Sequence, residues 1–85
     1  MNKEQIYKEA LEVYAALKQV AELSECDYCL SWWINTRNFS MKTTMSTPTI
    51  NRRASLLIRK GYLTIDKKLT STSSGTCYRF TTLKP

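Results

Sequence analysis

Histidine is absent from this chain of 85 residues, which therefore has no histidine-based catalytic triad, imidazole acid–base catalyst or histidine metal ligand. No apolar run approaches the about 18 residues that a membrane-spanning helix needs, and nothing resembles a secretion signal. Glycine and proline occur only twice each, and no linker-like tract or internal repeat is found. We therefore expect one cytoplasmic domain over residues 1–85 that is not an enzyme and has no membrane partner.

Cysteine is also scarce, with only Cys26, Cys29 and Cys77. An odd count argues against a disulfide scaffold. The spacing of Cys26 and Cys29 could form half of a zinc site, but zinc requires four ligands and one chain supplies only Cys77 in addition, unless an acidic side chain joins. We expect small buried thiols, with no metal and no cofactor.

Positive charge is concentrated in the second half of the chain. Residues 1–45 hold five basic and six acidic side chains, a net charge of −1, whereas residues 46–85 hold eight basic and one acidic, a net charge of +7. Such a patch gains affinity for polyphosphates by releasing their counterions. The distribution therefore favours a nucleic-acid partner.

The segment 46–63 is the most informative part of the chain. Ser46 or Thr47 can cap a helix whose first position suits Pro48, because proline lacks the amide hydrogen that would be unpaired there. At about 100° per residue, an apolar stripe falls on one side and a polar, cationic face on the other. The stripe holds Ile50, Ala54 and Leu57, with Ile58 at its edge, and the outer face holds Asn51, Arg52, Ser55 and Arg59.

This segment resembles the recognition helix and following strand of winged helix-turn-helix DNA-binding proteins. The family typically shows a serine, a Thr-Ile pair, two arginines, a leucine one turn on and a Lys-Gly-Tyr/Leu exit. These features read here as Ser46, Thr49-Ile50, Arg52-Arg53, Leu57 and Lys60-Gly61-Tyr62-Leu63, and the match extends over roughly residues 38–83. The resemblance implies a small regulator, such as those of phage or plasmid operons.

The first half of the chain predicts two further helices. Asn2 and Gln5 can form a capping box, and helical apolar spacing continues from Lys3 to about Leu23. Apolar residues left on that helix could contact a second copy in a homodimer. A second helix should cover part of Ser31–Lys42, with Trp32 and Trp33 mostly interior.

The end of the chain predicts a β-hairpin over residues 62–83. Leu63 and Ile65 alternate with polar residues, and Thr76–Leu83 is rich in β-formers, with Tyr78 and Phe80 facing the core. A tract of serine, threonine and glycine between them would form the tip of a wing, where Lys67 and Lys68 add charge.

Together these features predict an α+β winged helix-turn-helix in which three helices are followed by a two-stranded wing, in the order α-α-α-β-β. Its parts would be an N-terminal helix over 1–23, the helix-turn-helix over 31–60 and the wing over 62–83. The expected function is sequence-specific binding of double-stranded DNA, in transcription control. Base edges would be addressed by Thr47, Thr49, Asn51, Arg52, Ser55 and Arg59, and phosphates by Arg53, Lys60, Lys67, Lys68, Ser73 and Arg79.

Two alternatives stay open from the sequence. The domain could be an accessory DNA-binding factor in replication or excision, with no output in transcription. It could instead be a protein-interaction module, such as a small inhibitor of a host or defence enzyme. In that case Glu22, Glu25 and Asp27 beside Trp32-Trp33 would form the binding surface.

Overall fold

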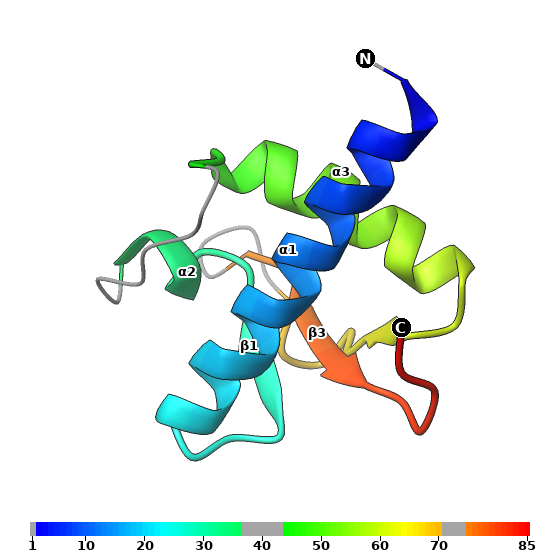
Figure 1. Ribbon diagram of the computed structural model, residues 1–85. Coiled ribbons are helices and arrows are strands. Elements are labelled where there is room, and N and C mark those ends of the chain that lie inside the picture. The colour runs from blue at the N-terminus through cyan, green and yellow to red at the C-terminus, as the bar shows by residue number, and fades with distance from the viewer. Residues whose placement is uncertain (1, 37–43, 71–74) are drawn as a thin grey trace.

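The computed structural model describes residues 2–36, 44–70 and 75–85. This part of the chain is α+β, with three helices and a three-stranded antiparallel sheet (Figure 1). In chain order the elements are α1 (Lys3–Leu23), β1 (Tyr28–Leu30), α2 (Trp33–Thr36), α3 (Thr47–Arg59), β2 (Leu63–Ile65) and β3 (Cys77–Phe80). None of these helices is long and apolar enough to cross a membrane.

Helix α1 spans the predicted residues and begins at the predicted cap. Asn2 Oδ1 accepts from the Gln5 amide at 2.8 Å, but the Gln5 side chain bonds to Glu9 rather than closing the capping box. At the other end the helix finishes at Leu23 with Ser24 as its C-cap, and the next residue, Glu25, has a left-handed φ of 56°. The amides of Glu25 and Cys26 donate back to Glu22 and Ala21, a Schellman arrangement in which glycine is the commoner residue.

Helix α3 also confirms the local prediction. Ser46 Oγ accepts from the Thr49 amide, and Pro48 lies in the first turn, where its missing amide hydrogen costs nothing. The helix ends at a second Schellman arrangement in which Gly61, at φ 85°, is the left-handed residue and the Tyr62 amide donates to Leu57. The observed span of Thr47–Arg59 is one residue earlier at each end than expected.

The sheet corrects the predicted order of elements. Strand β1 precedes α2, and the strand order is β1-β3-β2, so the expected α-α-α-β-β order and the two-stranded sheet are wrong. Strand β3 pairs antiparallel with both neighbours, with Cys29 opposite Tyr78 on one side and Leu63 opposite Phe80 on the other. A three-residue strand carries too little periodicity to be read locally, and its partner lies far along the chain.

The core forms where α1 crosses α3 above the sheet. The predicted stripes of both helices are buried, and the fully buried members include Val13, Leu17, Ile50 and Leu57. Two expectations fail at the edge of the core: Trp32 is 36% exposed and Ile65 is 44% exposed. Trp32 lies beside Gly75, where a side-chain Cβ would come within 3.3 Å of the Trp32 ring.

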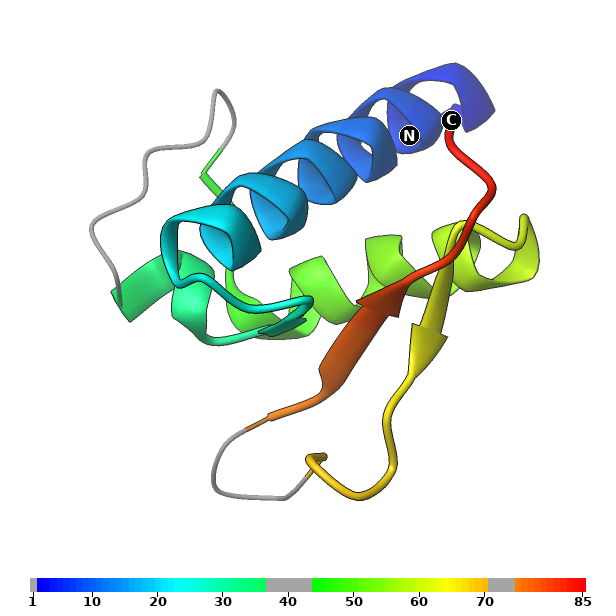
Figure 2. The same ribbon diagram turned by 90° about the horizontal axis from the view of Figure 1, so that it is seen from below.

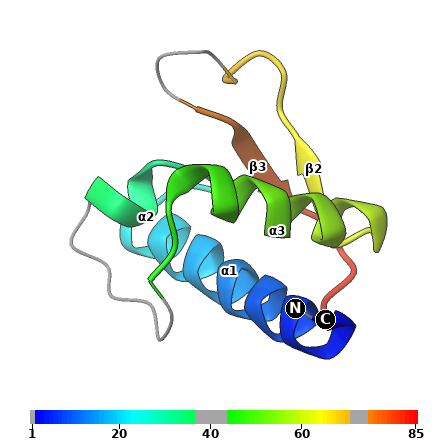
Figure 3. The ribbon, with the colours of Figure 1, turned by 90° about the horizontal axis from the view of Figure 1, so that it is seen from above.

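Strands β2 and β3 form the hairpin that the sequence predicts. Figures 2 and 3 show that the hairpin extends on the side of α3 that faces away from α1. Its root is held by the Asp66 amide, which donates to the Cys77 carbonyl at 2.9 Å, and by Thr70, whose hydroxyl accepts from the Cys77 amide at 2.9 Å. Residues 37–43 of the expected helix-turn-helix and residues 71–74 of the expected wing tip lie outside the described residues.

Candidate nucleic-acid interface

The exposed face of α3 carries two arginines and a serine. Arg52, Ser55 and Arg59 are exposed and follow one another at spacings of three and four residues, so they share one side of the helix. The opposite side is anchored by Ile50, Ala54 and Leu57, which are 0% exposed. Because that stripe is buried, the arginine-bearing side faces solvent.

Hydrogen bonds organise the first turn of α3. Arg52 Nη2 donates to Thr49 Oγ1 at 3.3 Å, and Ser46 Oγ donates to the same oxygen at 3.1 Å. Thr47 Oγ1 accepts from Asn35 Nδ2 at 3.2 Å, which ties the end of α2 to the start of α3. The sequence reading missed Asn35, since no local pattern shows that a residue 12 positions away lies beside the helix start.

Asn51 has an intramolecular partner. It is half-buried, and its Oδ1 accepts from the Tyr78 hydroxyl at 2.7 Å. Tyr78 is 2% exposed, and burial raises its pKa to about 12. The side-chain oxygen of Asn51, which the sequence assigns to a base, therefore accepts a hydrogen bond that links α3 to β3.

Arg53 is also engaged inside the molecule. Its Nε donates to Glu9 Oε1 at 2.9 Å, and the two side chains are only 16% and 10% exposed. The hydrogen bond from Arg53 holds the pKa of Glu9 below its usual value, against the opposing effect of burial. Arg53, which the sequence assigns to a phosphate, thus forms an ion pair between α3 and α1.

Arg79, predicted to meet phosphate, lies between two carboxylates of its own chain. Its Nε donates to Asp66 Oδ2 at 2.6 Å, and its Nη1 lies 3.1 Å from Asp27 Oδ1. The bond from Arg79 lowers the pKa of Asp66, whose carboxylate also accepts from the amides of Lys68 and Leu69. This network shapes the turn that follows β2.

Five predicted cations are exposed. In the described residues none of them takes part in an ion pair with a carboxylate. They come from the outer face and end of α3 and from the turn after β2: Arg52, Arg59, Lys60, Lys67 and Lys68. Ser73, also expected at the wing, lies outside the described residues.

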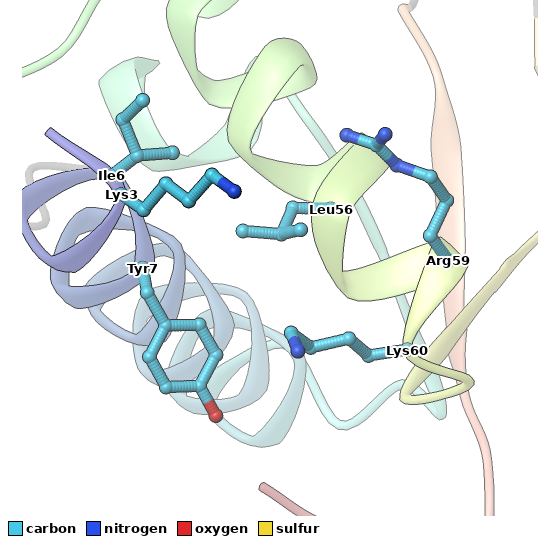
Figure 4. Close-up of a pocket in the computed structure, with 6 residues that line it drawn as sticks. All are labelled: Lys3, Ile6, Tyr7, Leu56, Arg59 and Lys60. Atoms are coloured by element: carbon cyan, nitrogen blue, oxygen red, sulfur yellow. The ribbon is translucent and has the colours of Figure 1, made fainter. Parts of the chain in front are cut away.

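The sequence reading also missed a cation of α1. Lys3 lines the same groove as Arg59 and Lys60, where the first turns of α1 approach the end of α3 (Figure 4). The Lys60 ammonium is 5.2 Å from the centre of the Tyr7 ring. Lys3 was overlooked because it belongs to the half of the chain whose charges nearly cancel.

The three cysteines are free thiols. Cys29 and Cys77 are buried, and Cys26 is half-buried. Burial raises the pKa of the Cys77 thiol, which favours its protonated form. Over the residues that the structure describes, no group of three cysteine or acidic side chains could hold a metal ion.

Comparisons with protein-family models, with curated proteins and with solved structures found no match to this chain. The contacts and charges of its own residues therefore carry the functional interpretation.

Proposed function

We propose that this chain is a winged helix-turn-helix domain that binds double-stranded DNA at specific sequences and acts in transcription control. The observation that carries this proposal is the exposed face of α3, where Arg52 and Arg59 stand opposite a fully buried stripe. The helix has 13 residues and is about 20 Å long. The major groove admits one such helix and presents guanine acceptors that arginine can bind through two hydrogen bonds.

Arg52 and Arg59 are the proposed base readers, with Ser55 between them. The bond from Arg52 to Thr49 holds the guanidinium near the start of the helix, which leaves its other donors for a base edge. Thr47 and Thr49 support this geometry through their bonds to Asn35 and Ser46. Asn51 is assigned to the Tyr78 contact rather than to a base.

The β2–β3 hairpin supplies the proposed wing. It projects on the side of α3 away from α1 (Figures 2 and 3), and Lys67 and Lys68 are exposed on the turn after β2. Asp66 fixes that turn by accepting from the Lys68 and Leu69 amides. Lysines on such a turn suit phosphate oxygens, which position a protein on the duplex without reading its sequence.

The protein-interaction alternative loses part of its proposed surface. Trp33 is 7% exposed and belongs to the core, whereas the Asp27 side chain remains 84% exposed although it pairs with Arg79. An accessory role in replication or excision uses the same DNA-binding surface, so it differs only in the output of binding.

A selection from random duplex DNA followed by a salt titration tests the proposal. The full chain should enrich a defined site, and its affinity should fall as salt is added. Each neutralised phosphate contributes about −0.9 to the slope of the logarithm of the binding constant against the logarithm of the salt concentration. Phosphate contacts from Lys60, Lys67 and Lys68 alone predict a slope of about −3. Failure to enrich any sequence, or affinity that stays constant between low and moderate salt, would refute the proposal.

A further inference from the structure

A groove lies between the first turns of α1 and the last turn of α3. Its volume is about 380 Å³, and it is lined by Lys3, Ile6, Tyr7, Leu56, Arg59 and Lys60. Figure 4 shows Lys3 and Lys60 reaching into it from opposite helices, with the Tyr7 ring and Leu56 beside them.

The lining combines two kinds of side chain. Three residues are apolar or aromatic, three are cationic, and no carboxylate is among them. A bare phosphate would satisfy the cations but leave the apolar surface wet, whereas a neutral hydrocarbon would bury that surface but leave the cations unused. Only a ligand with an apolar body and an anionic head matches both parts.

We propose that this groove binds a small amphiphilic carboxylate, with an aliphatic or aromatic body. The body would lie against Ile6, Tyr7 and Leu56, and the carboxylate would meet the cations at the rim. The volume is near the lower end of the range for small-molecule sites, so the ligand is small. The Lys60 ammonium, 5.2 Å from the Tyr7 ring, is already held over the groove.

The site has a consequence for DNA that rests on the proposed function. Arg59 lines the groove and is also a proposed base reader, and Lys60 is a proposed phosphate contact. A carboxylate bound there competes with DNA for the same donors. By linkage, the anion lowers DNA affinity by the factor by which DNA lowers anion affinity.

An NMR titration of the full chain without DNA tests the site itself, with octanoate as the probe. Octanoate should shift the resonances of Ile6, Tyr7 and Leu56, and affinity should rise up to about fourfold for each methylene added from butyrate to octanoate. Octanol and inorganic phosphate should bind the same residues far more weakly. No shift at these residues, or equal binding of octanol or of phosphate, would overturn the proposal.

Charge removal provides a matched pair of variants. Lys3→Gln should weaken octanoate by about twofold to fivefold, as expected for one exposed charge pair. Lys8→Gln removes an exposed lysine of α1 that does not line the groove, and it should bind octanoate like the parent. Both changes are at exposed positions of α1, and glutamine has nearly the same helix propensity as lysine. Equal weakening in both variants would reduce the effect to net charge and overturn the site.

The consequence for DNA is measured separately. Saturating octanoate should lower the affinity of the parent for its selected duplex, and Lys3→Gln should need more octanoate for the same loss. If octanoate fills the groove but DNA affinity stays unchanged, the competition is wrong and the site stands. If no duplex is bound at all, the proposed function has failed, and the NMR titration still decides the site.

Discussion

Arg53 and Glu9 form an ion pair between α3 and α1, with Arg53 Nε 2.9 Å from Glu9 Oε1. The two residues are 44 positions apart in the sequence, and both side chains are largely buried. The neighbouring Arg52 is exposed. Two adjacent arginines thus have different tasks: one holds the helix in place, and the other stands on the proposed reading face.

Acid should weaken the fold through the Glu9–Arg53 pair. The folded-state pKa of Glu9 is lowered from 4.5, so its stabilisation is present above that value and is lost as the pH falls through the lower folded pKa. Thermal unfolding followed from neutral to acid pH should give a falling melting temperature below about pH 4.5, and Glu9→Gln should flatten this dependence. Glu4→Gln is the control, because Glu4 is exposed on the same helix. An equal effect of both changes would contradict the assignment.

The arginine pair should separate specificity from stability. Arg52→Ala should keep the melting temperature and lose about 1–3 kcal/mol of discrimination at one base position, and Arg59→Ala should do the same at another. Arg53→Ala should instead lower the melting temperature, because it leaves Glu9 without its cation. Binding to single-base variants of the selected site, with parallel melts, checks this. If both Arg52→Ala and Arg59→Ala bind like the parent, α3 is not the reader.

Replacing Lys67 and Lys68 with alanine should weaken DNA binding without changing its sequence preference. These exposed lysines are proposed to contact phosphates, so cognate and random duplexes should lose affinity by a similar factor. The slope of log affinity against log salt should become less steep by about 2. Lys8→Ala, on α1 and away from the hairpin, should have little effect. A loss confined to the cognate site would mean that the wing reads bases.

The Tyr78–Asn51 hydrogen bond should contribute to stability. Tyr78→Phe removes the donor to Asn51 Oδ1 and should lower the free energy of unfolding by about 1 kcal/mol in denaturant titrations. Asn51→Ala should also destabilise the fold and leave base preference unchanged. A changed base preference in Asn51→Ala would return Asn51 to the reading face.

Tyr78 should also ionise late in alkali. Burial raises its folded pKa to about 12 from an ordinary 10.0, so the stability it contributes is complete below pH 10 and is lost as the pH rises through about 12. Phenolate absorbance should therefore show Tyr78 titrating about two pH units above an ordinary tyrosine, and Tyr78→Phe should remove that step. Its persistence in Tyr78→Phe would assign the late step to another tyrosine.

Local chemistry by itself determined α1, α3 and the β2–β3 hairpin. Asn2 and Ser46 accept from amides three residues away, and Gly61 supplies the left-handed turn after α3, so each of these signals acts within one helical turn. The buried stripe of α3 was equally readable, because helical spacing alone places Ile50, Ala54 and Leu57 on one side.

Only the tertiary structure decided which polar residues are available. The sequence assigns Asn51, Arg53 and Arg79 to DNA, but their partners Tyr78, Glu9, Asp27 and Asp66 lie far from them in the chain or across the sheet. Strand β1 and the groove around Lys3 and Lys60 depend on the same long-range packing. A helical period reports which side of a helix is buried, but a charge becomes paired or free only when distant elements bring its partner to it.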